Sequence, residues 1–333
     1  MASSERKPNY SRRFFWLAVF IVVLFGGYSA LWFYAAGKLE TIAGAAMAKF
    51  GRDGRSAECT NLTVRGYPFR MGLFCDGVRF EDTGRQVAAS AAAFRSAAQV
   101  YNPFHVVAEL DGPASITLPR TGPLSFTWQN LRASTVLAKD LPERASVETD
   151  ALAAQGSFGD VADTILANIG HAEGHMRRNG ADLDLAWSFA DAKLNPVLTR
   201  EITLPPLAGE ADLTIIGGTD LRRFNADSLR GRSGTIRTLA LSTGDTAGLS
   251  VAGPFAFSTE GVLSGDFKVT IRNPKALAAQ MAEIFPDKAG QIKAATMGLT
   301  ALGDSLTLPL KVANGKATLG FIPLGSVPPL PSP

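Results

Sequence analysis

The residues best suited to chemistry in this sequence are two histidines and a glutamate at alternate positions, His171, Glu173 and His175. Alternate residues of a β-strand point to one face, and imidazole and carboxylate groups both bind zinc. The three side chains are therefore candidate metal ligands, although a further ligand would have to come from elsewhere. The alternative is a solvated strand face, the more frequent role of such a strip. We expect no metal and no cofactor.

Two serines lie in sequences that resemble hydrolase motifs. Residues 303–306 (GDSL) spell a tetrad found at the nucleophile of an esterase group, and residues 248–252 (GLSVA) lack the last glycine of a nucleophile elbow. The esterase serine needs a histidine downstream, and no histidine follows His175. We therefore expect no catalytic residues and a protein that is not an enzyme.

The two cysteines, Cys59 and Cys75, enclose a segment with turn-forming residues at its centre, Gly66-Tyr67-Pro68. In a hairpin centred on Tyr67, the two cysteines lie opposite each other, and a disulfide can join them if the pair belongs to the closely spaced, non-hydrogen-bonded class. An oxidising compartment would favour the bond. The alternatives are two buried free thiols or half of a metal site.

An apolar segment without a charge runs from Phe14 to Ala36 and is long enough to cross a bilayer as a helix. Four basic residues and one acidic residue precede it, which predicts a cytoplasmic N-terminus and an exported remainder. A cleavable signal has a shorter apolar region, and the small-residue site around Met47 lies well beyond this segment. The pair Arg12 and Arg13 also resembles a twin-arginine export signal. Two arginines at the cytoplasmic end of a membrane helix are, however, common as determinants of its orientation. We predict a retained anchor whose partner is the lipid bilayer.

The charge of the chain is concentrated in its N-terminal tail. Of 33 basic and 30 acidic residues, four and one respectively lie in the first 13, so the exported part is formally neutral. A nucleic-acid partner would require clustered positive charge, and we expect none. Frequent glycine and proline, with short alternating runs such as residues 124–131 (LSFTWQNL), indicate a β-rich exported domain.

Turn and cap signals give the expected organisation. Asn-Gly at residues 179–180 and 314–315 predicts hairpins. Asn-Pro at residues 273–274 predicts a helix that ends before Pro286, and a second helix is expected over residues 287–303. The predicted fold is mainly β (α+β): a transmembrane helix followed by an elongated, curved antiparallel sheet with a few helices. The expected divisions are a basic tail (1–13), a transmembrane helix (14–36), a helical stalk (37–58) and two β-rich halves (59–204 and 205–333).

Several segments carry a resemblance to a known family. They are the N-terminal anchor, residues 59–82 (CTNLTVRGYPFRMGLFCDGVRFED), residues 97–113 (AAQVYNPFHVVAELDGP) and residues 314–330 (NGKATLGFIPLGSVPPL). In this order they resemble domain-of-unknown-function family 2125, a bacterial envelope family, and more loosely the AsmA-like group. The wider group implies a curved β scaffold with an apolar groove that acts in envelope maintenance and lipid movement. The resemblance supplies no catalytic residues.

The resulting prediction is a single-pass protein of the bacterial inner membrane, with its N-terminus in the cytoplasm and its C-terminal domain in the periplasm. The domain binds or shields lipid, or supports envelope assembly. The first alternative is a structural or adaptor protein that docks envelope partners without a ligand. The third is a metal-dependent or serine hydrolase.

Overall fold

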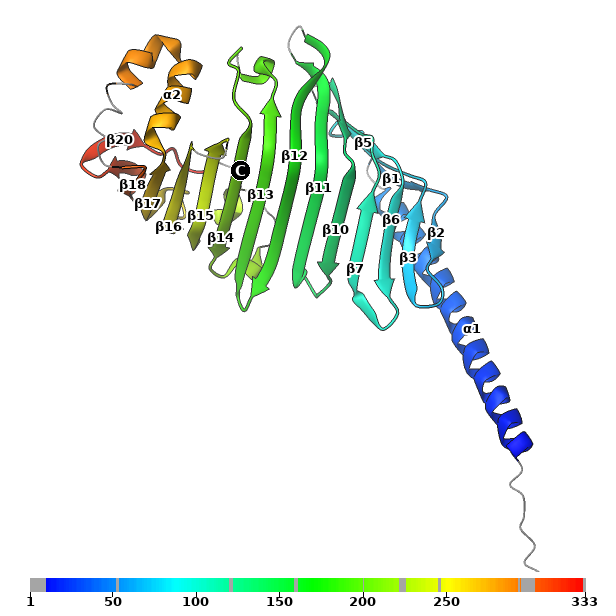
Figure 1. The fold of residues 1–333 in the computed structure, drawn as a ribbon. Helices are drawn as coiled ribbons and strands as arrows, with labels where there is room; N and C mark the ends of the chain where they lie inside the picture. Colours follow the sequence, from blue (N-terminus) through cyan, green and yellow to red (C-terminus); the bar gives the residue numbers. More distant parts are fainter. Residues whose placement is uncertain are drawn as a thin grey trace, which may run out of the picture.

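The computed structural model describes residues 10–51, 54–119, 122–158, 161–199, 201–221, 226–244, 247–292, 294 and 303–331. Residues 1–9 of the predicted tail and most of the helix predicted over 287–303 lie outside the described residues. The described residues form an open antiparallel sheet of 20 strands with an apolar helix, α1 (Tyr10–Phe50), at one end (Figure 1). A short helix, α2 (Pro274–Ile284), lies near the other end. The mainly β fold with an elongated antiparallel sheet is therefore confirmed.

α1 joins the predicted anchor and stalk in one continuous helix. Most side chains between Phe14 and Ala36 are exposed, whereas Trp32 and Ala36, near the sheet, are buried. The stalk is shorter than expected, because the helix ends at Phe50 and the first strand begins at Arg55 instead of after residue 58. Gly54 adopts a positive φ of 78°, which permits the turn between the two elements.

The first ten strands are the halves of five long strands that each bend once. The first limb of the bend contains β2 (Thr63–Arg65), β3 (Arg70–Cys75), β6 (Phe94–Gln99), β7 (Asn102–Leu110) and β10 (Asn130–Val136). The second limb contains β1 (Arg55–Thr60), β4 (Gly77–Asp82), β5 (Val87–Ala91), β8 (Ala114–Leu118) and β9 (Gly122–Thr127). The limbs meet at β11 (Arg144–Phe158), whose first half pairs with β10 and whose second half pairs with β9. The bend divides this end of the sheet into two limbs.

The disulfide between Cys59 and Cys75 is present and links the two limbs, with 5.3 Å between the Cα atoms. The predicted hairpin register is wrong. Thr63 pairs with Phe74, which shifts the centre of the hairpin, and Cys59 pairs with Val78 in the second limb. The cysteines meet because the chain changes limb after β1, and not because they face each other across one hairpin.

The remaining strands form a meander in which each strand pairs with the next in sequence. They are β12 (Val161–Asn179), β13 (Asp182–Leu194), β14 (Leu207–Ile215), β15 (Ser233–Thr243), β16 (Ala247–Phe257), β17 (Leu263–Arg272), β18 (Ser305–Ala313), β19 (Lys316–Leu319) and β20 (Ile322–Ser326). Both Asn-Gly hairpins are confirmed, between β12 and β13 and between β18 and β19. The pairing of β13 with β14 carries the sheet across the expected boundary at residues 204–205.

The Asn-Pro pair at residues 273–274 is confirmed as a helix start. The Asn273 side chain accepts a hydrogen bond of 3.0 Å from the Ala276 amide, and Pro274 occupies the first turn, where its missing amide proton is not needed. α2 ends at Ile284, before Pro286, as predicted. Short 3₁₀ turns lie in the connections: η1 (Pro196–Thr199) follows β13, η2 (Gly218–Asp220) and η3 (Ala226–Leu229) lie between β14 and β15, and η4 (Pro286–Lys288) follows α2.

The sheet has one apolar and one polar face, because directly paired residues of antiparallel strands point to the same side. One row across β7 to β16 contains Ala108, Ala133, Val147, Gly174, Trp187, Ala211, Leu239 and Val251. The neighbouring row, on the opposite face, contains Glu109, Arg132, Glu148, Glu173, Ser188 and Glu210. Among the described residues, Leu183 is the only large side chain that is less than 2% exposed. The apolar face is therefore only partly covered by other parts of the chain.

Candidate functional site

β12 places His171, Glu173 and His175 on the polar face, as their spacing predicts. Nδ1 of His171 lies 2.7 Å from Oδ1 of Asp150 on β11, and Nε2 of His175 lies 3.2 Å from Oε2 of Glu173. His175 also contacts the Ser146 hydroxyl through Nδ1, at 3.0 Å. Each histidine therefore has its own hydrogen-bond partner.

The local hydrogen bonds shift two of these ionisable groups. The bond to Asp150 raises the pKa of His171 above the ordinary value of 6.5. Hydrogen bonds from Ser188 and His175 lower the pKa of Glu173. Within the described ranges, no group of three or more histidine, cysteine, aspartate or glutamate side chains is arranged to hold a metal ion. The strip forms paired polar contacts on a half-exposed strand face.

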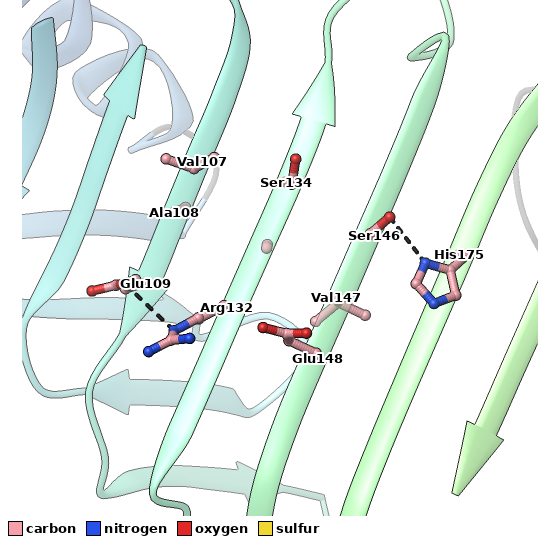
Figure 2. Close-up of a pocket in the computed structure, with 10 residues that line it drawn as sticks. Val107, Ala108, Glu109, Arg132, Ser134, Ser146, Val147, Glu148 and His175 are labelled. Atoms are coloured by element: carbon pink, nitrogen blue, oxygen red, sulfur yellow. Dashed lines mark hydrogen bonds and ion pairs between the residues drawn. The ribbon is translucent and has the colours of Figure 1, made fainter. Parts of the chain in front are cut away.

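A shallow hollow of about 390 Å³ lies beside this strip, over β7, β10, β11 and β12 (Figure 2). The Arg132 guanidinium lies 3.6 Å from the Glu109 carboxylate, and Figure 2 shows this pair on neighbouring strands. Glu148 is paired with Arg132 in register, so the hollow carries charges of both signs. Its lining residues are Val107, Ala108, Glu109, Arg132, Ala133, Ser134, Ser146, Val147, Glu148 and His175.

The serines of the hydrolase-like motifs lie in strands far along the sheet from β12. Ser305 begins β18 and pairs with Arg272, while Ser250 lies within β16 and pairs with Thr270. The histidines lie in β7 and β12. Neither serine is brought to a histidine by the pairing of the sheet.

The site with the clearest binding character is an apolar groove of about 450 Å³ between β13 and β17. Only one of its twelve lining residues is polar, Ser228. The others are Leu185, Trp187, Leu213, Ile215, Leu221, Leu229, Ile236, Phe255, Phe257, Leu263 and Phe267. We call this site the apolar groove.

Alternation of apolar residues along each strand builds the apolar groove. On β13, Leu185 and Trp187 point to the same face, and on β14 Leu213 and Ile215 do the same. The segment between β14 and β15 contributes to the other side, because η3 brings Leu229 against the cluster around Leu183. A second buried cluster, around Phe255 and Phe267, lies at the other end. The groove therefore separates two packed regions, and Trp187 within it remains 44% exposed.

A charged cluster on the opposite face links β13, β14 and β15, which are three of the five strands that form the groove. The buried Asp184 carboxylate lies 2.8 Å from Nη2 of Arg177 and accepts a 2.6 Å hydrogen bond from Thr214. Arg237 also pairs with Asp184, at 3.6 Å, and with Asp212. Burial opposes ionisation, but these hydrogen bonds and charges hold the pKa of Asp184 below its ordinary value. The cluster joins β12 to β15.

Sequence reasoning did not identify the groove residues. The signal was present, because large apolar residues alternate with small or polar ones along much of β13 (LDLAW) and β15 to β17. Alternation identifies a face of a strand and leaves open which strands lie side by side. Bulges add to this uncertainty, because they change the pairing register. Arg237 is the extra residue of one bulge, since Asp212 pairs with Thr238 while Leu213 pairs with Ile236.

These features define a class of protein: an apolar N-terminal helix followed by an open antiparallel sheet whose apolar face is only partly covered. The chain belongs to the family described as "uncharacterized protein conserved in bacteria (DUF2125)", whose model matches residues 32–328. A search of curated proteins found no match. Among the described helices, α1 is long and apolar enough to cross a membrane, and a signal sequence would have the same properties. Together with the disulfide, it suggests an envelope location.

Proposed function

We propose that this protein is a non-enzymatic, AsmA-like protein of the bacterial inner membrane that binds or shields lipid acyl chains on its apolar sheet face. α1 is the single membrane span, with the N-terminus in the cytoplasm and the sheet in the periplasm. The observation that carries the proposal is the apolar groove, in which eleven of twelve lining residues are apolar.

The chemistry of the groove fits an acyl chain. Ligand sites in proteins have volumes of about 300–1,000 Å³, mostly apolar linings and a few polar groups. A hydrocarbon chain needs no hydrogen-bond partner, so a lining with a single hydroxyl suits it. Half-exposed Trp187 and Leu239 would also lose contact with water on binding, at about 25 cal/mol for each Å² of apolar area covered.

The tether of the sheet to a membrane also supports a lipid ligand. The span tethers the domain to a membrane, where phospholipid is the most concentrated apolar ligand. Arg12 and Arg13, at the start of α1, favour a cytoplasmic N-terminus. The domain then lies on the exported side, where the disulfide is stable.

Photocrosslinking of the full chain in lipid nanodiscs tests the proposal. A phospholipid with a diazirine in its acyl chain should label peptides from β13 to β17 as well as α1, as read by mass spectrometry. Trp187→Asn should reduce labelling of the groove several-fold and leave α1 labelling unchanged. Val107→Asn is the matched control, because Val107 is similarly exposed but lies on the polar face, in the row of Ser134. Labelling confined to α1 would refute lipid binding.

A second candidate function is docking of envelope proteins without a ligand. The observation that favours it is β20, an edge strand that pairs with β19, where Ile322 is 63% and Leu324 57% exposed. Exposed apolar edge strands invite pairing with another chain. If the groove takes no lipid, crosslinking in cells from a photoreactive residue at Leu324 should capture a protein. If the photoreactive residue at position 324 captures no protein, this candidate function is contradicted.

A further inference from the structure

α1 is packed against the tip of the hairpin between β2 and β3. The Trp32 indole donates a 3.1 Å hydrogen bond to the Arg70 carbonyl, and the Tyr28 hydroxyl donates one to the Pro68 carbonyl. Tyr67 stacks on Phe33 with 5.5 Å between ring centroids. Trp32 is only 5% exposed, so the contact fixes the height of the hairpin tip along the helix.

The length of the span places this contact inside the membrane boundary. A hydrocarbon core about 30 Å thick takes about 20 helical residues to cross. Counted from Phe14, the first residue after Arg13, that length ends near Phe33. If the hairpin tip were held in water, only Phe14 to Gly27 would remain to cross the core, which is about 21 Å of helix. The span is therefore long enough to cross the hydrocarbon core only if the hairpin tip enters the membrane surface.

A second hairpin tip lies beside the first. The Val100 amide donates a 3.0 Å hydrogen bond to the Phe69 carbonyl, which joins the turn between β6 and β7 to the turn between β2 and β3. Figure 1 shows both turns at the end of the sheet where α1 lies. We call residues 66–70 and 100–104 the tip patch.

The tip patch has the composition of a membrane interface. Three of its four aromatic side chains are largely exposed, Tyr101 at 76%, Phe69 at 69% and Phe104 at 64%, whereas Tyr67 packs on α1. Neither segment contains an acidic residue, and Arg70 supplies a positive charge. Tyrosine and other aromatic rings favour the headgroup level, where an apolar ring and a polar tip are both satisfied. Positive charge favours anionic lipid phosphates.

We propose that the tip patch inserts into the outer interface of the membrane that α1 crosses, so that the sheet rests on the bilayer through these two turns. The proposal rests on α1 as a retained span, and it does not depend on lipid binding in the groove. Apolar contact of the rings with the bilayer fixes the orientation of the first limb relative to the membrane plane.

Site-directed spin labelling of the full chain in nanodiscs tests the insertion. The two native cysteines are joined, so a single introduced cysteine carries the nitroxide. Tyr101→Cys reports the tip patch, Val22→Cys reports the middle of the span, and Phe321→Cys is the control. Phe321 is fully exposed, on the turn between β19 and β20 at the other end of the sheet. Collisions with oxygen, enriched in lipid, and with a water-soluble nickel complex give the depth of each label.

The Tyr101 label should collide with oxygen several-fold more, relative to nickel, than the Phe321 label. A Tyr101 label as open to nickel as the Phe321 label would overturn the insertion while leaving the span intact. A Tyr101 label shielded from both reagents would place the tip patch against protein, such as a second copy of the chain, and would also overturn it. A Val22 label open to nickel would overturn the span itself, and the insertion with it.

Discussion

At the residue scale, the polar face contains pairs of side chains in which each group shifts the pKa of the other. His171 and Asp150 are the clearest case, because the hydrogen bond between them raises the pKa of His171 and lowers that of Asp150. Both side chains are more than 40% exposed, so solvent screens their attraction. We therefore expect this pair to affect how stability changes with pH more than the size of the free energy of unfolding.

Asp150→Asn should lower the pKa of His171 towards its ordinary value of 6.5. The raised pKa stabilises the fold at pH values below about 6.5, and this contribution is lost as the pH rises through the folded-state value. The lowered pKa of Asp150 acts in the opposite sense: its contribution is present above the unfolded value of 3.8 and is lost as the pH falls through the folded one.

An NMR titration of the histidine ring protons measures this effect. The His171 resonance should shift its midpoint downward in the Asp150→Asn protein. An unchanged midpoint for His171 would show that Asp150 does not hold its proton.

At the scale of elements, the first limb depends on close approach of two strands. Gly72 on β3 lies against β6, where Leu73 and Ser96 exchange hydrogen bonds at 2.9 and 3.3 Å. A Cβ atom built on Gly72 would lie 1.7 Å from the Ser96 carbonyl oxygen and 2.9 Å from the Cα of Ala97. The atoms that the added Cβ would meet belong to the backbone of β6, so the clash could be removed only if β3 and β6 moved apart.

Gly72→Ala should lower the free energy of unfolding by about 2 kcal/mol or more, because it overpacks a strand contact that no rotamer can relieve. Thermal unfolding of the full chain in detergent, followed by circular dichroism, gives the change. Gly77→Ala on β4 is the matched control, because its added Cβ would meet no atom closer than 3.7 Å. Equal melting temperatures for the two variants would contradict the close packing of β3 and β6.

At the scale of the whole molecule, a simple meander produces a long sheet in which one face is polar and the other apolar. Such pairing of neighbours requires few long loops, but a lone sheet cannot bury both faces. In the part of the chain that the structure describes, the buried clusters on the sheet are small and lie around Leu183 and Phe267. The apolar face, the disulfide between the limbs and the helix at one end together favour a scaffold that works against a membrane.

The proposed topology predicts the activity of reporter fusions. Alkaline phosphatase fused after Pro333 should be active, because the enzyme folds only where disulfides form and the sheet is placed on the exported side. The same reporter fused ahead of Met1 should be silent. Activity assays in whole cells, with immunoblots to confirm equal amounts of fusion protein, make the measurement. A silent fusion after Pro333 would reverse the assignment of compartments.

The sequence by itself determined the features that depend on local pattern. The charge-free segment from Phe14 to Ala36 identified the apolar helix, and period-two alternation with turn residues identified a mainly β sheet. Asn273 and Pro274 identified the start of α2, because cap and proline chemistry act within one helical turn. Two cysteines in one chain allowed one intramolecular bond.

Only the tertiary structure decided which strands meet. Cys59 and Cys75 join two limbs through a bend that no local pattern of residues specifies, so the predicted hairpin register was wrong. Trp187, Ile236 and Phe267 line one groove because the register and bulges of five strands align them, and pairing across strands depends on long-range contacts. The polar strip around His175 was visible from the sequence, whereas the apolar groove required the folded sheet.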